Sequence, residues 1–303
     1  MGKIAFVFAG QGAQAPGMGH GIYETSEAAK KVFEAADAVR PGTSDQCFNG
    51  TDEELQITKN TQPCLYTVEM AIAAAVAEAG IKADITAGFS LGELSALTYA
   101  GVFSLEDGLN IVKARGELMQ QAAEKHDTSM AAVMKLSEED VIRICSEYEH
   151  VYPVNFNCPG QISVSGDANE MLTFADAVKE AGGRAKVLKV NGAFHSPYMT
   201  EAAEGFAKVI EPIEFKTAAT PVYSDFTGVR YAEADMKKAL SSQINNPVKW
   251  ETIIRNMIAE GVDTFIELGP GKTLCGLIKR ISSEVRLFNV AAPEDLEKLK
   301  AEL

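Results

Sequence analysis

The chain has few of the features that mark nucleic-acid-binding or membrane proteins. Its 28 Lys and Arg residues are outnumbered by 42 Asp and Glu residues, which gives a net charge of −14. Because binding to phosphate backbones requires a basic surface, this balance argues against nucleic acid as a partner. No segment reaches the ~18 consecutive apolar residues that a membrane-spanning helix needs, so we expect no membrane association.

Cysteine is also scarce. The five cysteines, at positions 47, 64, 145, 158 and 275, include no C-x-x-C pair. An odd number at scattered spacing argues against a disulfide framework and against a zinc site. We therefore expect reduced, mostly buried thiols, a cytoplasmic protein and no bound metal ion.

Alternating strand and helix patterns are what the chain does contain. Apolar runs at 3–9, 85–89 and 262–268 each predict a buried strand, and such runs are typical of parallel sheets. Further patterns predict a strand at 221–228 and helices at 28–39, 66–79 (after Pro63), 105–124, 199–210, 235–244 and 250–259. The alternation predicts an α/β fold with a parallel sheet.

The middle of the chain has a different order of predicted strands and helices. Strand patterns at 129–136, 151–156, 161–166 and 184–190 enclose helix patterns that begin at 137 and 169. The order βαββαβ is that of a ferredoxin-like unit. We predict that residues 1–126 and 194–303 form an α/β-hydrolase-like domain with a parallel sheet, and that 127–193 form an inserted ferredoxin-like subdomain.

The segment Gly88-Phe89-Ser90-Leu91-Gly92 has the form G-x-S-x-G. A predicted strand precedes it and a helical pattern follows, which is the setting of a nucleophilic serine on a sharp turn. The flanking glycines avoid Cβ clashes in such a turn, and the helix N-terminus favours negative charge. We predict that Ser90 is a nucleophile and that the Leu91 N–H donates to an oxyanion. The alternative is an N-cap serine between two chance glycines.

A nucleophilic serine needs a base, and the chain has four histidines. His126 and His150 lie in polar stretches that are expected to face solvent, and His20 lies in the first glycine-rich loop. His195 lies where the insert rejoins the main domain, and such junctions line interdomain clefts. From its position alone, His195 could equally be a catalytic base or a packed core histidine. No acid between Ser90 and His195 is marked as a third member, so a neutral group is expected to orient the ring.

One arginine interrupts the apolar stripe of the predicted 105–124 helix. Arg115 lies between Ile111 and Leu118 on that face. A buried guanidinium needs a partner. The partner is either an acid of the protein, such as Glu117, or a carboxylate on a substrate, which arginine binds through two N–H groups.

The loop after the first strand fits the dinucleotide fingerprint G-x-G-x-x-A. Pro16 and two further glycines separate this loop from any helix, which argues against a nicotinamide cofactor. Since strand ends line the crevice of an α/β sheet, we expect the loop to bring the N–H of Gln11 close to a reacting carbonyl.

Together with the serine turn, ordered motifs along nearly the whole chain resemble the malonyl-CoA:acyl-carrier-protein transacylase family of fatty acid synthesis. The motifs are FAGQGAQ at 8–14, NTQP at 60–63, GFSLGELSAL at 88–97, Arg115, NCPGQISVSG at 157–166, GAFHSPYM at 192–199, QINNPVKW at 243–250 and ELGPGK at 267–272. The resemblance implies ping-pong transfer of malonyl from malonyl-CoA to the phosphopantetheine thiol of acyl carrier protein. It implies no cofactor beyond these substrates.

The same resemblance implies a role for each matching residue. Ser90 would be acylated, His195 would be its base, and a main-chain carbonyl in the Gln243 segment would orient the imidazole. The N–H groups of Gln11 and Leu91 would form the oxyanion hole. Residues implied to contact the substrate are Arg115, which would bind the malonyl carboxylate, and the cleft residues Asn157, Gln62 and Phe194.

One residue departs from the family pattern. Phe89 stands where family members usually have histidine, which leaves the shape and polarity of the acyl pocket open.

The rival functions are a thioesterase or acyl hydrolase on the same Ser–His site, an acyltransferase of a polyketide pathway, and a non-catalytic carrier-protein binder.

Docking of a carrier protein raises a question of charge. Such carriers are generally acidic, and this chain is acidic too. A local basic patch would be needed, with ordinary solvated side chains as the alternative. The candidates are Lys186, Lys189, Lys272, Lys279 and Arg280. We expect a monomer.

Overall fold

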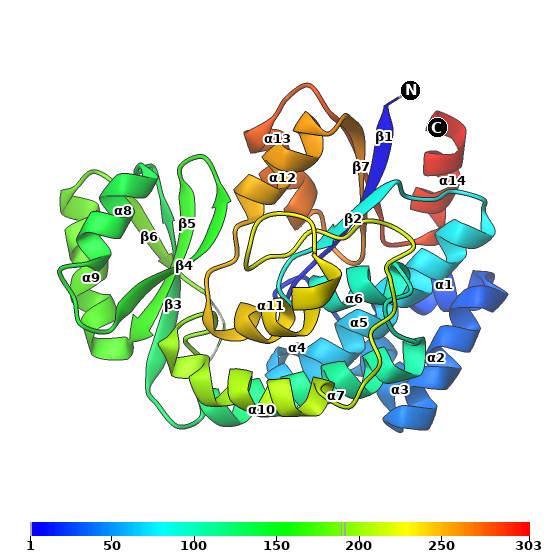
Figure 1. The fold of residues 1–303 in the computed structure, drawn as a ribbon, viewed down its shortest axis with the longest axis horizontal. Helices are drawn as coiled ribbons and strands as arrows, with labels where there is room; N and C mark the ends of the chain where they lie inside the picture. The colour runs from blue at the N-terminus through cyan, green and yellow to red at the C-terminus, as the bar shows by residue number, and fades with distance from the viewer. Residues whose placement is uncertain (1, 189, 191) are drawn as a thin grey trace.

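The computed structural model describes residues 2–188, 190 and 192–303, and these residues form two separate sheets (Figure 1). The first sheet is parallel, in the order β2-β1-β7-β8, and its strands are β1 Lys3–Phe8, β2 Ile85–Gly88, β7 Val262–Leu268 and β8 Arg286–Val290. The second is antiparallel, in the order β4-β5-β3-β6, and its strands are β3 Thr128–Met134, β4 Val151–Cys158, β5 Gln161–Asp167 and β6 Arg184–Val187. The predicted α/β fold with a parallel sheet is confirmed.

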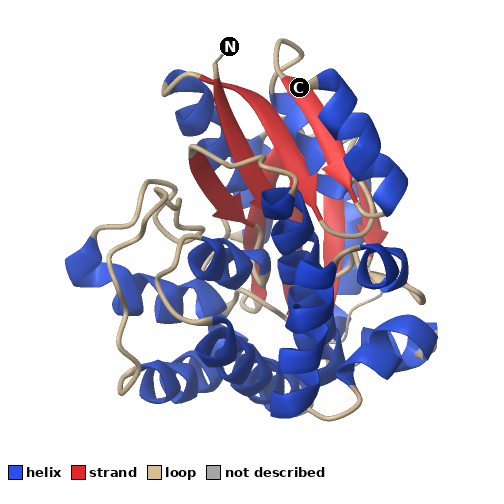
Figure 2. Ribbon diagram, turned by 90° about the vertical axis from the view of Figure 1, so that its right-hand side faces the viewer, coloured by secondary structure: helices blue, strands red, loops and turns tan. Residues whose placement is uncertain are grey.

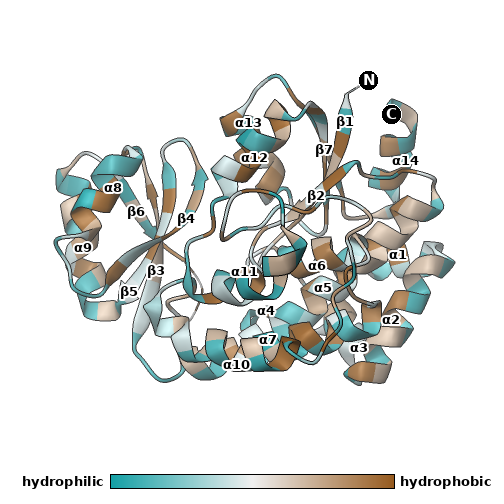
Figure 3. Ribbon diagram, viewed as in Figure 1, coloured by the Kyte–Doolittle hydropathy of each residue, from teal (hydrophilic) through white to brown (hydrophobic). Residues whose placement is uncertain are grey.

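Helices cover both faces of the parallel sheet (Figure 2). Alternation along β1 explains this, because Phe6 and Phe8 belong to one hydrophobic core whereas Ala5 and Val7 belong to another. Brown and teal segments alternate along helices such as α2, as one buried face requires (Figure 3). The helices of this part are α1 His20–Thr25, α2 Glu27–Val39, α3 Thr43–Asn49, α4 Asp52–Gln56, α5 Thr58–Glu78, α6 Gly92–Tyr99, α7 Leu105–Ala123, α10 Thr200–Ile210, α11 Met236–Ser242, α12 Trp250–Ala259, α13 Thr273–Ile281 and α14 Pro293–Glu302.

The antiparallel sheet has its own helices and its own core. Its chain order is β3-α8-β4-β5-α9-β6, with α8 at Glu138–Cys145 and α9 at Ala168–Glu180, which is the βαββαβ order predicted. This unit lies to one side of the parallel sheet, at the left of Figure 1. Backbone hydrogen bonds tie it to the rest of the chain. The Phe156 N–H donates to the Val248 carbonyl at 2.9 Å, and the Val248 N–H donates to the Val154 carbonyl at 2.9 Å.

Several features of the fold differ from the prediction. Helices α1, α3, α4 and α14 were not predicted. Helix α5 begins at Thr58, so Pro63 lies inside it instead of before it. The buried side chains around Pro63 explain its tolerance, because their packing offsets a proline penalty of about 3 kcal/mol. Residues 221–228 form only isolated bridges, at Val222 and Tyr223, in place of the predicted strand. Strand β8, which is only partly buried, was not predicted.

Two further findings concern the composition. Four of the five cysteines are buried, Cys275 is partly buried, and all five are free thiols. Within the described ranges, no helix combines the length and the apolar character that crossing a bilayer requires.

Candidate active site

Ser90 lies at the turn between β2 and α6, and close packing at two glycines forces the sharpness of that turn. A Cβ on Gly88 would come within 1.9 Å of the Gly92 backbone, and a Cβ on Gly92 would come within 2.2 Å of the Phe8 carbonyl oxygen. Ser90 itself has a φ of 55°, in the left-handed region. Such a conformation costs about 1–3 kcal/mol in a non-glycine residue and persists only where its surroundings hold it.

Two remote side chains hold the backbone of Ser90. Its N–H donates to Asp225 Oδ2 at 2.6 Å, and its carbonyl accepts from Gln243 Nε2 at 2.6 Å. Asp225 and Gln243 are both fully buried. Both polar groups of the strained residue are therefore fixed from outside its own turn.

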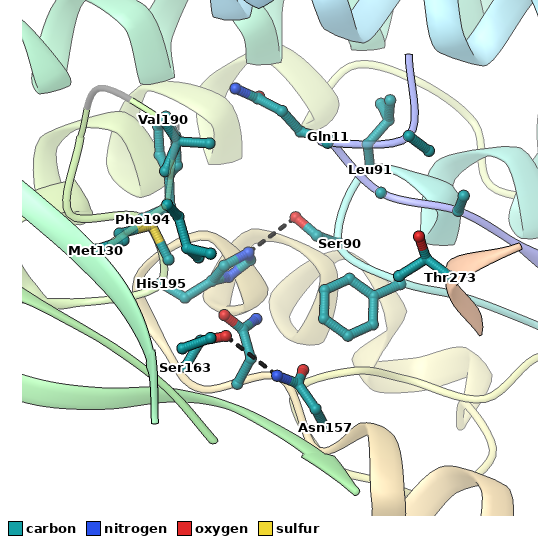
Figure 4. Close-up of a pocket in the computed structure, with 18 of the residues that line it drawn as sticks. Gln11, Ser90, Leu91, Met130, Asn157, Ser163, Val190, Phe194, His195 and Thr273 are labelled. Atoms are coloured by element: carbon teal, nitrogen blue, oxygen red, sulfur yellow. Dashed lines mark hydrogen bonds between the residues drawn. The ribbon is translucent and has the colours of Figure 1, made fainter. Parts of the chain in front are cut away.

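His195 faces the serine hydroxyl. Its Nε2 lies 2.8 Å from Ser90 Oγ (Figure 4). Its Nδ1 lies 2.8 Å from the main-chain oxygen of Gln243. A carbonyl can only accept, so Nδ1 carries the proton and the Nε2 lone pair faces the hydroxyl. Burial, with the nearby Arg115 charge, lowers the pKa of His195 from 6.5 to about 4. The ring is therefore neutral at physiological pH.

Arg115 is the third group at the serine hydroxyl. The residue is 1% exposed, and its Nη2 lies 3.2 Å from Ser90 Oγ. Its other hydrogen bonds go to amide oxygens, from Nη1 to Gln62 Oε1 at 2.8 Å and from Nη2 to Gln243 Oε1 at 2.7 Å. None of the ion pairs within the described residues involves Arg115. The protein acid considered from the sequence, Glu117, is exposed instead.

Two N–H groups beside the serine have no acceptor among the residues that the structure describes, those of Gln11 and Leu91. Leu91 is fully buried, and a buried N–H is rarely left unpaired without a reason. Gly10 lets the first loop approach the serine turn, because a Cβ there would lie 2.7 Å from the Phe89 carbonyl oxygen. Figure 4 shows Gln11 and Leu91 on the same side of Ser90.

These groups open into a cavity of about 240 Å³ between the two sheets. Its walls include every predicted site residue except Gln243, which lies buried behind Ser90 and Arg115. Asn157 donates from Nδ2 to Ser163 Oγ at 3.1 Å, whereas its buried Oδ1 has no partner in the described part of the chain. Phe89 also lines the cavity and packs edge-on against Trp250, with ring centroids 5.5 Å apart.

Sequence reasoning missed several polar residues of the site. Asn155 lines the cavity two positions before Asn157, and their period-two spacing on β4 was the available signal. Glu93 and Asp225 lie fully buried behind the serine. An acid within the apolar pattern of the 92–99 helix was a signal for Glu93, whereas Asp225 lies in a segment predicted as a strand and gave none.

Candidate ligands for a metal ion do not cluster. In the described ranges, no group of three or more His, Cys, Asp or Glu side chains is placed to hold one.

Comparisons with known proteins agree with this geometry. Residues 5–292 match the acyl transferase domain family. The malonyl CoA-acyl carrier protein transacylase of Bacillus subtilis is 41% identical over 98% of this chain and 96% of its own length. The crystal structure of the transacylase of the same name from Clostridium perfringens is 38% identical, covers 99% of this chain and 96% of its own, and superposes with a TM-score of 0.96.

A second similar structure contains a partner. It is a malonyl-transacylase in complex with a type II polyketide acyl-carrier protein, and it is 34% identical, with a TM-score of 0.95 over 99% of this chain and 100% of its own. Full-length similarity at these identities shows common descent, and the chain belongs to the malonyl-CoA:acyl-carrier-protein transacylase family.

Proposed function

We propose that this enzyme moves a malonyl group from coenzyme A to the phosphopantetheine thiol of acyl carrier protein, for fatty acid synthesis, through an ester on Ser90. One observation carries the proposal. A neutral imidazole, at 2.8 Å, and a guanidinium that has no carboxylate partner among the described residues, at 3.2 Å, meet at the same serine oxygen. A nucleophile, a base and an anion clamp are what transfer of a carboxylated acyl group needs.

Acylation begins at the hydroxyl. His195 Nε2 takes the Ser90 proton while Oγ attacks the thioester carbon of malonyl-CoA. The tetrahedral intermediate then collapses, the carbon–sulfur bond breaks, and the imidazolium returns the proton to the departing thiolate. The Gln243 carbonyl keeps Nδ1 protonated throughout, at 2.8 Å, without a buried charge of its own.

Negative charge forms on the carbonyl oxygen during the attack. The N–H groups of Gln11 and Leu91 are the proposed donors, and loss of one such donor typically costs about 10²–10³ in rate. Helix α6, which begins at Gly92, adds the positive end of its dipole on the same side.

The malonyl carboxylate is proposed to bind Arg115. Gln62 and Gln243 hold the guanidinium at 2.8 and 2.7 Å, so its direction is set before substrate arrives. An acetyl group would leave this cation unpaired, which is a strong basis for rejection. Phe194, 6% exposed beside the base, is proposed to close the acyl side of the cavity. Asn157 Oδ1, which no described residue bonds, is proposed to accept a hydrogen bond from the substrate.

Transfer completes the cycle by the reverse steps. The carrier thiol loses its proton to His195, attacks the malonyl ester, and leaves as the thioester while Ser90 regains a proton. The related structure with a polyketide carrier makes such a carrier the alternative acceptor. No cofactor takes part in the proposed cycle.

The proposed docking surface is basic and local. Lys186, Lys272 and Lys279 are exposed. Arg280 is already engaged, because it donates to the Pro159 carbonyl at 3.1 Å and to the Gln161 side chain. Lys189 lies outside the described residues. If reversing the charges of Lys186 and Lys279 together left the KM for the carrier protein unchanged, this surface would be wrong.

The finer architecture is also a proposal. We assign residues 1–126 and 194–303 to an α/β-hydrolase-like domain, because the serine lies between a strand of the parallel sheet, β2, and helix α6. We assign residues 127–193 to a ferredoxin-like subdomain, because the order β4-β5-β3-β6 and two helices support it. A monomeric protein in the cytoplasm completes the proposal.

The test separates loading from transfer. The enzyme is incubated with malonyl-CoA, freed of donor, and then given phosphopantetheinylated carrier protein or buffer alone. We expect an ester that persists in buffer and disappears only as malonyl-carrier forms. Rapid loss of the ester in buffer would favour a hydrolase instead.

A further inference from the structure

A buried carboxylate lies one side chain away from the anion clamp. Glu93, on the first turn of α6, is fully buried, and its Oε2 accepts from Gln243 Nε2 at 2.8 Å. The oxygen of the same amide accepts from Arg115 Nη2 at 2.7 Å. The Gln243 amide thus stands between a cation and an acid, with its oxygen towards the cation and its nitrogen towards the acid.

The hydrogen bonds around Glu93 suit an ionised carboxylate. Its Oε1 accepts from the Asp225 N–H at 3.0 Å and from the Tyr231 hydroxyl at 2.6 Å, so with Gln243 three donors point at the group. An ionised carboxylate only accepts, and donors of this kind stabilise the charged form.

A second buried acid near the serine, Asp225, accepts fewer hydrogen bonds. Asp225 accepts through Oδ2 alone, and its Oδ1 has no partner among the described residues. Burial raises the pKa of both acids, of Glu93 to about 7 and of Asp225 well above its ordinary value. Burial thus makes both carboxyl groups harder to ionise, and the donor pattern places the negative charge on Glu93 and the proton on Asp225.

We propose that Glu93 is a positioning residue that supplies the resting counter-charge of Arg115 through the amide of Gln243. A buried cation needs an anion nearby, yet an acid in direct contact would occupy the place of the substrate carboxylate. The intervening amide meets both needs, because it keeps the cation balanced and no carboxylate of Glu93 lies in direct contact with the guanidinium. This inference rests on the proposed malonyl transfer.

Exchange of Glu93 for glutamine tests whether Glu93 acts on Arg115 through the Gln243 amide. In Glu93→Gln, the oxygen keeps the Tyr231 and Asp225 donors, so the new NH₂ faces the NH₂ of Gln243. The Gln243 amide must then lose this bond or turn its own NH₂ towards Arg115. Since hydrogen bonds to charged groups are worth about 1.5–3 kcal/mol, we expect the ratio of malonyl to acetyl loading rates to fall at least ~10-fold.

Two companion variants keep the test decisive. Tyr231→Phe removes one donor to Glu93 without touching Gln243, and should shift the same ratio in the same direction by less, even if Glu93→Gln does not fold. Glu106→Gln makes the same exchange at an exposed position of α7 and should leave the ratio at the wild-type value.

The competing outcome is a purely structural role. In that case, Glu93→Gln would slow malonyl and acetyl loading in parallel. An unchanged loading ratio in Glu93→Gln or in Tyr231→Phe would overturn the inference. Malonyl loading of the wild-type enzyme would still support the proposed function. A wild-type enzyme that loads no malonyl would overturn both together.

Discussion

Replacement of Arg115 by methionine isolates the charge of the clamp from its volume. The side chain is 1% exposed, so truncation to alanine would open a cavity and mix a packing defect with the electrostatic effect. Methionine is unbranched and flexible, and it fills much of the same space. What it removes is the cation, its bonds to the amide oxygens of Gln62 and Gln243, and its bond to Ser90 Oγ.

We expect the substitution to change the preference for malonyl over acetyl more than the overall loading rate. Removing one partner of a buried ion pair typically costs about 3–5 kcal/mol, which corresponds to about 10²–10³ in rate or more. The malonyl carboxylate would suffer this loss, whereas acetyl has no charge to leave unpaired. The amide oxygens left without a donor would affect both acyl groups alike, so they cancel in the ratio.

A competition assay measures this ratio directly. Arg115→Met is given an equimolar mixture of malonyl-CoA and acetyl-CoA, and the esters on the enzyme are separated by mass. We expect the malonyl preference to fall by about 10²–10³. Lys113→Met, two positions earlier on the polar side of α7, serves as the control and should keep the preference. An unchanged preference in Arg115→Met would refute the clamp.

Three further predictions follow from the same geometry. Gln243→Glu places a carboxylate on Arg115 itself, so malonyl loading should fall far more than acetyl loading, and equal losses would count against this reasoning. Gly92→Ala should lower the melting temperature markedly, because its Cβ would lie 2.2 Å from a main-chain oxygen, whereas Gly276→Ala, with nothing within 4 Å in a helix, should be neutral or stabilising by about 0.5–1 kcal/mol. His195 is kept neutral by the fold, so the unfolded chain takes up a proton first as pH falls from 6.5 towards 4 and stability declines across that window. Denaturant titrations should show a shallower decline in His195→Gln.

Local sequence patterns were enough to predict the nucleophile and much of the fold. The serine turn was predictable because a strand, two glycines and a helix must occur in fixed order to build it. Helix α12 was predicted with its observed bounds, because its buried residues follow one helical face.

Contacts between distant segments were harder to predict. Nothing local marks Asp225 as the acceptor for Ser90, since the two are 135 positions apart and meet only in the folded chain. The start of α5 at Thr58, before Pro63, was missed because a local penalty was outweighed by burial, which the sequence does not display. The bond from His195 to the Gln243 carbonyl was expected only through the family resemblance, because a main-chain oxygen has no sequence signature.

The mass of the intact protein after exposure to malonyl-CoA bears most directly on covalent catalysis by Ser90. Wild-type enzyme should gain one malonyl group, and peptide mapping should place it on Ser90. Ser90→Ala should gain nothing. An equal gain in the alanine variant, or no gain in the wild-type protein, would contradict the account.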